Sequence, residues 1–262
     1  MTFIESVILG LVQGLTEFIP ISSSGHLVVA QYFFSGASDH LFLEWINIGT
    51  MLALIVYFWQ RIVGIVQDIF IHRNLRLLRN ILLTSLPAGI VGYFASDAIE
   101  NNAFFGSLVV VAVMSALVGV IMIVLEKLPK ASPVANGEKL PASRAFIIGV
   151  AQMIALIPGT SRSGATIIAG RLNGLSAKEA AEYSFLASLP IMAGVTLKVL
   201  LKDHAYLMAH LDTLLIGNVV AFVSGILAVG FLMRYLAKHG LALFGWYRIA
   251  LSLVLVAIIL LQ

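Results

Sequence analysis

Six long apolar stretches limit the folds open to this sequence more than any other feature. They cover residues 43–60, 80–96, 106–125, 181–201, 214–233 and 245–261. A helix of such a length crosses the roughly 30 Å of hydrocarbon in a bilayer. Only 11% of the residues are charged, whereas about a quarter is usual in a soluble domain. The sequence therefore predicts one all-α integral membrane domain over residues 1–262, with about six transmembrane helices.

Two further apolar stretches, residues 3–34 and 145–172, differ from these six because a cluster of Pro, Ser and Gly interrupts each one. Neither half of either stretch is long enough to cross a bilayer alone. Irregular backbone at membrane depth is tolerated only inside protein or beside a wet cavity. We therefore expect both stretches to form re-entrant helical hairpins, which return to the side from which they enter.

The basic residues support this topology, because they gather in alternate loops. Twelve lie in segments 61–79, 126–144, 171–178 and 234–244, two lie in segment 198–212, and none lies in loop 97–105. If both hairpins return to their own side, all twelve fall on one face, as the positive-inside rule requires. Since these residues separate apolar runs, the net charge of +3 does not indicate a nucleic-acid partner. The expected partner is the lipid bilayer, and the oligomeric state stays open.

The sequence also contains an internal repeat. A shift of 139 residues places 10–13 on 149–152, 22–25 on 161–164, and 105–106 on 244–245. Together with the charges, this common offset predicts two inverted copies, about 1–125 and 145–262, joined by loop 126–144. Inverted repeats place binding sites near the bilayer midplane on broken helices.

The two interruptions are the candidate site, and we call residues 13–26 the first tip and residues 158–166 the second tip. Each tip leads into a new helix, whose exposed N–H groups and dipole favour phosphate. The planar guanidinium of Arg162 suits phosphate oxygens. The candidate catalytic residues are Glu17, Ser23, His26 and Arg162. The candidate substrate-binding residues are Gln13, Ser22, Ser24, Gly25, Ser161, Ser163, Gly164 and Thr166.

The tips differ where chemistry is expected. Under the same shift, Glu17, Ser23 and His26 of the first copy align with Leu156, Arg162 and Ala165. One tip thus supplies an acid, a hydroxyl and an imidazole, and the other supplies a cation. Each residue also has a structural interpretation. Glu17 can pair with Arg162, His26 can be an interior histidine, and the serines can bond to their own turns.

Four other polar residues keep two interpretations. Gln13 lies one helical turn before Glu17, so it either contacts the ligand or makes a hydrogen bond in helix packing. Glu44 and Glu182 either complement helix dipoles or belong to the site. Arg248 either extends to the membrane interface or contributes to the site.

The motifs that carry Gln13 and Glu17, residues 20–26 and residues 158–166 resemble those of the undecaprenyl pyrophosphate phosphatases, the bacitracin-resistance proteins. This resemblance covers essentially the whole chain. It implies a multi-pass enzyme of the inner (plasma) membrane that removes one phosphate from a C55 polyprenyl pyrophosphate and recycles the carrier lipid for cell-wall synthesis.

The resemblance further implicates Glu17, Ser23, His26 and Arg162, and it implies a divalent cation, Mg²⁺ or Ca²⁺. The family position of Gln13 accepts Glu or Gln. With Gln there, chelation by two carboxylates is disfavoured, but a metal site on Glu17 alone is compatible with magnesium, which takes other ligands from water and phosphate.

The residues predict one of two reaction routes. Either Ser23 attacks the terminal phosphorus and His26 accepts its proton, or His26 attacks and Ser23 contacts phosphate.

The prenyl chain requires a lateral opening between helices. The main alternative is a secondary transporter or lipid flippase, because inverted repeats are transporter architecture, although a carrier has no need of a nucleophile. A purely structural scaffold does not explain Arg162.

Overall fold

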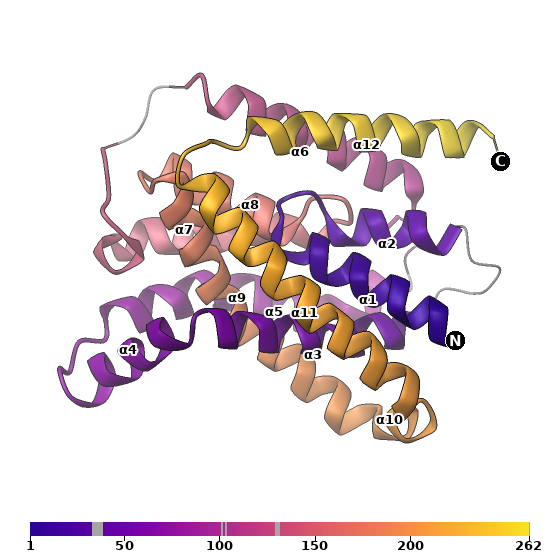
Figure 1. Cartoon of the computed structure of the whole chain (residues 1–262). Coiled ribbons are helices and arrows are strands. Elements are labelled where there is room, and N and C mark those ends of the chain that lie inside the picture. The colour runs from indigo at the N-terminus through magenta and orange to yellow at the C-terminus, as the bar shows by residue number, and fades with distance from the viewer. Residues whose placement is uncertain (33–38, 101, 103, 129–131, 262) are drawn as a thin grey trace.

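The chain folds into a bundle of helices in the computed structural model, which describes residues 1–32, 39–100, 102, 104–128 and 132–261 (Figure 1). No strand occurs in these described ranges. The helices are α1 (Phe3–Phe18), α2 (Ser23–Tyr32), α3 (His40–Tyr57), α4 (Trp59–Phe70), α5 (Arg76–Glu100), α6 (Leu108–Leu125), α7 (Ala142–Met153), α8 (Arg162–Leu172), α9 (Ala177–Lys202), α10 (His204–Ala209), α11 (Leu211–Leu236) and α12 (Ala242–Leu260), with 3₁₀ turns η1 (Gly137–Lys139) and η2 (Ile154–Leu156).

Five of these helices, α5, α6, α9, α11 and α12, are long and apolar enough to cross a membrane. There are six if the pair formed by α3 and α4, which is bent by 72°, counts as one span. Large apolar side chains lie exposed on the outside of the bundle, as at Phe94 and Leu227, where a protein in water rarely leaves a large apolar surface. The prediction of an all-helical protein with about six spans is confirmed.

Helix α4 was not predicted, because the sequence placed residues 61–79 in a loop. The segment is amphipathic, so its overall polarity hides its helical period. Ile62 and Ile65 pack against the core, while Phe70 and Ile71 are exposed. An amphipathic helix bent away from a span is typical of the membrane interface.

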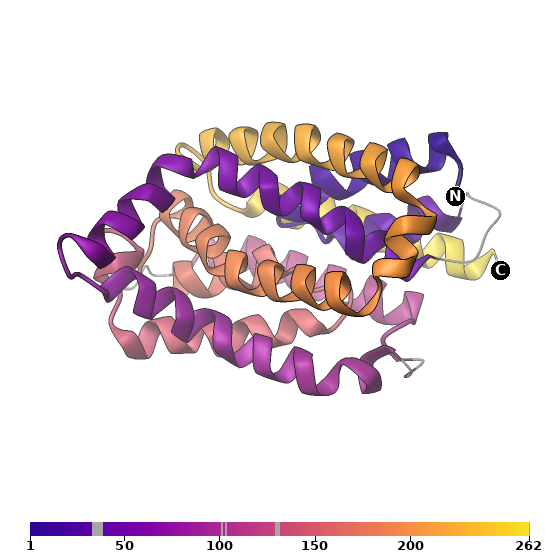
Figure 2. The ribbon, with the colours of Figure 1, turned by 90° about the horizontal axis from the view of Figure 1, so that it is seen from below.

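The two halves of the chain interleave. Helix α1 packs along α11 of the second half, α7 packs along α5 of the first half, and α6 packs along α12 (Figures 1 and 2). Equivalent glycines permit the first two contacts. A Cβ on Gly10 would lie 2.5 Å from the carbonyl oxygen of Gly217, and one on Gly149 would lie 2.7 Å from that of Leu83. Each broken stretch therefore rests against a long helix of the other half.

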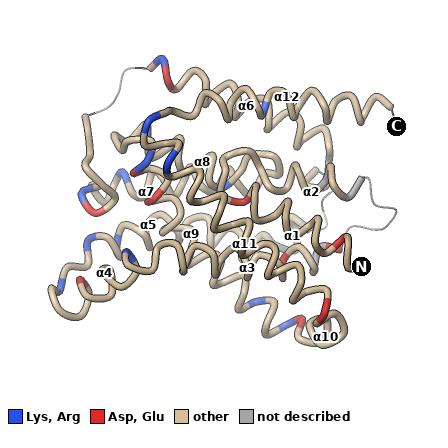
Figure 3. The backbone as a smooth tube through the Cα atoms, viewed as in Figure 1, with Lys and Arg blue, Asp and Glu red and all other residues tan. Residues whose placement is uncertain are grey.

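Charged side chains lie mainly at the ends of the bundle, and the end that carries α4 and α7 holds most of the basic ones (Figure 3). Helices α3 and α9 pack together, and one ion pair joins α4 to α9 while another joins α3 to α9. Arg61 lies 3.2 Å from Glu182, and Lys198 lies 3.8 Å from Glu44. The two glutamates are therefore paired with cations at the ends of α3 and α9 and lie outside both tips.

Candidate active site

The two tips meet in the middle of the bundle. Helices α1 and α2 approach from the end that holds the N-terminus, and α7 and α8 approach from the other end (Figure 1). The tips touch through Gly159, whose backbone N–H donates to the hydroxyl of Ser24 at 3.5 Å. Residues that lie 135 positions apart in the sequence thus share one site.

The turns have the same local geometry, centred on Ser22 and Ser161. Both serines have positive φ angles, 74° and 71°, which are uncommon outside glycine. Each hydroxyl caps the following helix, because it accepts the N–H of Gly25 at 3.3 Å or of Gly164 at 3.2 Å. In both turns the hydroxyl of the serine two positions later, Ser24 or Ser163, lies 3.1 Å away. A strained backbone that recurs at two positions is a feature of functional sites.

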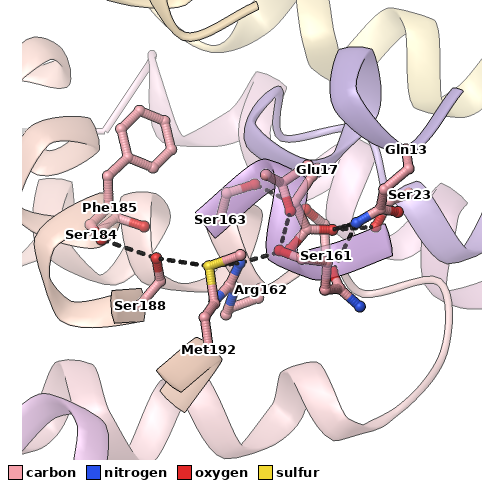
Figure 4. Close-up of polar contacts among 12 residues, drawn as sticks. Gln13, Glu17, Ser23, Ser161, Arg162, Ser163, Ser184, Phe185, Ser188 and Met192 are labelled. Atoms are coloured by element: carbon pink, nitrogen blue, oxygen red, sulfur yellow. Dashed lines mark hydrogen bonds and ion pairs between the residues drawn. The ribbon is translucent and has the colours of Figure 1, made fainter. Parts of the chain in front are cut away.

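Glu17 is the centre of the polar network (Figure 4). Its Oε1 accepts a hydrogen bond from Arg162 Nη2 at 2.5 Å, and the two side chains form an ion pair. Its Oε2 accepts from the Ser23 hydroxyl at 2.8 Å and from Gln13 Nε2 at 3.1 Å. Gln13 also donates to Asn47 Oδ1 at 2.7 Å. Because the side chain of Glu17 is only 13% exposed and that of Arg162 20%, this charge pair is shielded from most solvent.

His26 lies in the same turn as Ser23 but has other partners. Its Nδ1 lies 2.8 Å from the backbone oxygen of Ser22, and its Nε2 lies 2.6 Å from the hydroxyl of Tyr247. A carbonyl only accepts, so Nδ1 carries the hydrogen and a neutral ring accepts from Tyr247 at Nε2. The Ser23 hydroxyl therefore donates its hydrogen bond to Glu17, whereas His26 is bonded to Tyr247.

Arg248 holds the two tips together from behind. Its side chain is fully buried, so it does not extend to the membrane interface. The guanidinium donates to the backbone oxygens of Pro20 in the first tip and Gly159 in the second. It also donates to two backbone oxygens of α6, those of Ser115 at 3.3 Å and Met114 at 3.4 Å. Arg248 is thus a clamp on the backbone of both turns.

Two threonines of the second tip, the predicted Thr166 and its neighbour Thr160, differ in their hydrogen-bond partners. Thr166 donates to the backbone oxygen of Arg162 at 2.8 Å and to the hydroxyl of Ser184 or accepts from it at 2.5 Å. It therefore joins α8 to α9 and does not face the charge pair. Thr160, by contrast, has a buried hydroxyl in the second tip that finds no hydrogen-bond partner among the described residues.

Sequence reasoning did not single out Asn47, Met192 or Tyr247. Asn47 is a lone amide in an apolar span, which is a usable signal because polar groups at membrane depth are costly. Met192, whose sulfur lies 3.6 Å from Arg162 Nη2, looks like any apolar residue of a span. Tyr247 lies 221 positions from His26, and an aromatic residue in a span carries no signal of its own.

The donor set limits which metal the site can hold. No group of three His, Cys, Asp or Glu side chains gathers in the described parts of the chain. Glu17 is the carboxylate of the network, and Asn47 adds an amide oxygen 2.7 Å from Gln13 Nε2. Oxygen donors suit Mg²⁺ or Ca²⁺ when water and substrate phosphate complete the shell, so these residues fit such an ion.

These features together suit the handling of a phosphate group. A hydroxyl lies against a carboxylate that can accept its proton, and a guanidinium next to two helix N-termini provides for negative charge. An α-helix leaves its first four N–H groups without partners inside the helix, and each serine cap takes one of them.

Comparison with known proteins identifies the same family over nearly the whole chain. The family described as bacitracin resistance protein BacA matches residues 6–254. The chain is 36% identical over 261 residues to undecaprenyl-diphosphatase 2 of Shewanella oneidensis, covering 98% of both chains. It is 39% identical over 257 residues to the undecaprenyl-diphosphatase of Ectopseudomonas mendocina, covering 97% of this chain and 92% of the relative. It is 38% identical over 261 residues to undecaprenyl-diphosphatase 1 of Clostridioides difficile, covering 97% and 94%.

Proposed function

Since the chain belongs to the family of the bacitracin resistance protein BacA, we propose that it is a membrane enzyme that hydrolyses undecaprenyl diphosphate to undecaprenyl phosphate and phosphate. Such a reaction recycles the carrier lipid used in cell-wall synthesis. The names of its relatives support this activity. The observation in the site that carries the proposal is the 2.8 Å hydrogen bond from Ser23 to Glu17, beside Arg162.

Ser23 is the nucleophile in this proposal. Its Oγ attacks the terminal phosphorus while its proton passes to Glu17 Oε2, and the bond from phosphorus to the bridging oxygen breaks. Undecaprenyl phosphate leaves with the proton from Glu17, and water then attacks the phosphoserine to release phosphate and restore the hydroxyl. Phosphoryl transfer needs mainly position and charge neutralisation, which Arg162 provides by binding phosphate oxygens.

His26 acts in this scheme through its contact with Tyr247 and the backbone of Ser22, which fix one tautomer and one ring orientation. The competing route, attack by His26 Nε2, first requires that Nε2 leave the hydroxyl of Tyr247. The hydrogen-bond partners of the two residues therefore favour Ser23.

A divalent cation, Mg²⁺ or Ca²⁺, belongs to the proposal, with Glu17 as its protein carboxylate. When bound, it neutralises charge on the phosphate oxygens. Gln13 occupies a position from which a second carboxylate could reach the same ion, so the chain holds its cation with one carboxylate and with substrate oxygens.

In the membrane, we place the α1–α2 and α7–α8 pairs as two re-entrant hairpins of an inverted repeat in the inner (plasma) membrane, with the basic α4 end in the cytoplasm. Three features support this arrangement. The halves align at one offset, the serine turns share their geometry, and equivalent glycines contact the opposite half. Opening of the site to the outer face follows the family expectation.

The proposal is tested by phosphate release from undecaprenyl diphosphate by the purified protein in detergent with Mg²⁺ or Ca²⁺. Turnover is expected there, because an enzyme needs no gradient, whereas a flippase or transporter would release none. Ser23→Ala should abolish turnover. The matched control is Ser107→Ala, since Ser107 begins α6 without a side-chain cap bond.

A second measurement separates the nucleophiles. Rapid quenching with labelled substrate should trap acid-stable phosphoserine in the native enzyme. Trapped phosphohistidine, together with residual turnover by Ser23→Ala, would overturn the assignment of Ser23 while leaving the reaction itself in place.

A further inference from the structure

An apolar groove of about 630 Å³ runs between α5 and α9, within the roughly 300–1,000 Å³ typical of ligand pockets. Leu86, Ile90 and Phe94 of α5 line one wall, and Pro190 and Val195 of α9 line the other. The helices stand apart where they carry glycine. A Cβ on Gly89 or on Gly194 would meet no atom within 4 Å, so at these two positions the helix faces open space.

The middle of the groove adjoins the candidate active site, because a Cβ on Gly92 of α5 would lie 3.4 Å from Leu156 Cδ2. Leu156 lines the groove, and it ends the 3₁₀ turn η2, two residues before the second tip. Pro190 also lines it and belongs to α9, the helix whose Met192 sulfur is 3.6 Å from Arg162 Nη2 (Figure 4). The groove therefore reaches, at Leu156, the segment that leads into the second tip.

The equivalent helix pair in the other copy, α11 with α3, has no such opening. There a Cβ on Gly49 would lie 2.3 Å from the carbonyl oxygen of Asn218, and one on Gly225 would lie 3.1 Å from the Cβ of Ala53. Glycine thus brings α3 and α11 into contact, whereas it leaves space between α5 and α9. Because one of two duplicated helix pairs is open, the groove is not a simple result of the repeat.

We propose that the groove between α5 and α9 binds the prenyl chain of the substrate, a proposal that rests on the proposed function. The chain leaves the diphosphate near Arg162, enters at Leu156 and Pro190, and follows α5 toward Phe94. The lining runs from Leu82 to Ile99, roughly 25 Å along a helix that rises 1.5 Å per residue, and the entry at Leu156 lies between its two ends. The charged lining residues Glu44 and Lys198 form an ion pair with each other, so the wall remains suited to hydrocarbon.

The open glycines provide the test. Gly89→Phe and Gly194→Phe place a ring in the groove from positions where the new Cβ meets no atom within 4 Å, and Phe is a better helix former than Gly. Gly64→Phe on α4 is the matched control, since a Cβ there also meets nothing within 4 Å and Gly64 does not line the groove. For each variant, kcat/KM is measured with undecaprenyl diphosphate and with dimethylallyl diphosphate, a single isoprene unit.

The ratio of kcat/KM for the long substrate to that for the short one should fall at least about tenfold in both groove variants, because the loss of two buried methylene groups already has that effect. The ratio should not change in Gly64→Phe. An unchanged ratio in Gly89→Phe and Gly194→Phe, with normal melting in detergent, would overturn the groove assignment. A native protein that releases phosphate from neither substrate would instead overturn the proposed function.

A substrate with a photoreactive group at the far end of its prenyl chain shows independently which helices that chain contacts. Its crosslinks should fall on α5 and α9, and the Phe variants should lose them. Crosslinks on α3 and α11 that persist in both variants would place the prenyl chain elsewhere.

Discussion

Glu17→Gln tests which residue accepts the proton of Ser23. The substitution keeps the size of the side chain and its ability to form hydrogen bonds, but it removes the charge and the basic oxygen. Since the Ser23 hydroxyl lies 2.8 Å from Glu17 Oε2, the variant loses a general base. That loss costs about 10²–10⁴-fold in rate, and we expect kcat to fall by this factor.

Substrate affinity should respond differently from kcat. Arg162 Nη2 is 2.5 Å from Glu17 Oε1, so a phosphate that binds Arg162 has to share the guanidinium with a carboxylate. Glutamine leaves the arginine charge without that counter-charge. At saturating Mg²⁺ or Ca²⁺, we therefore expect KM to stay constant or to fall while kcat drops, a combination that a merely unfolded fraction of enzyme does not produce.

The assay is phosphate release in detergent over a range of substrate concentrations, with melting curves to show that each variant is folded. Glu5→Gln is the control on the same helix, because Glu5 belongs to the capping box at the start of α1. Retention of more than about a tenth of kcat by Glu17→Gln, below the range for a base, would refute the assignment. The assignment would also be refuted if His26→Gln lost as much kcat as Glu17→Gln while Glu17→Gln still formed phosphoserine, because His26 would then be the base.

Four further predictions concern phosphate binding by Arg162, the Arg248 clamp, the divalent cation and the topology. Arg162→Lys should reduce kcat at least about tenfold, because lysine lacks the planar fork and a phosphate hydrogen bond in such a site contributes about 2–3 kcal/mol; a native rate would make Arg162 a simple point charge. Arg248→Lys should lower the melting temperature, since one ammonium cannot reach the backbone of both turns and each carbonyl left without a partner costs about 1–3 kcal/mol; unchanged melting would contradict the clamp. Gln13→Glu should lower the Mg²⁺ or Ca²⁺ concentration for half-maximal activity by adding a carboxylate, and an unaltered titration would argue against a cation on Glu17. Single cysteines at Arg73 and Asp212, in a chain that has none, should react with an impermeant reagent from opposite sides of the membrane; reaction from the same side would rule out the inverted arrangement.

The spans could be predicted from the sequence because one physical quantity, the length of an apolar run, decides them. All six apolar stretches correspond to helices. The α4 helix could not be found in this way, since half of its surface is polar and hydropathy averages over both faces. The 72° bend that separates it from α3 depends on packing and not on composition.

The sequence pointed to residues of the two tips where a side chain was costly to place at membrane depth. Glu17 and Arg162 stood out for that reason, and the structure brings them into one ion pair. The partner of His26 could not be predicted, because Tyr247 lies on α12 and an aromatic residue there needs no explanation. Arg248 had the right signal, a charge within an apolar stretch, but neither interpretation of it included a clamp on backbone carbonyls.

Arg248 also sets the order of events during synthesis. It reaches back 228 positions to the carbonyl of Pro20, from α12, which is translated after both tips. At the usual 5–20 residues per second, roughly 10–45 seconds pass between the translation of the first turn and that of its clamp. A nascent or prematurely ended chain can therefore contain every proposed catalytic side chain and still lack the contact that holds the two turns together. The active site should appear only after residue 248 has been translated, and a stop codon shortly before it should abolish activity even though both tips are encoded.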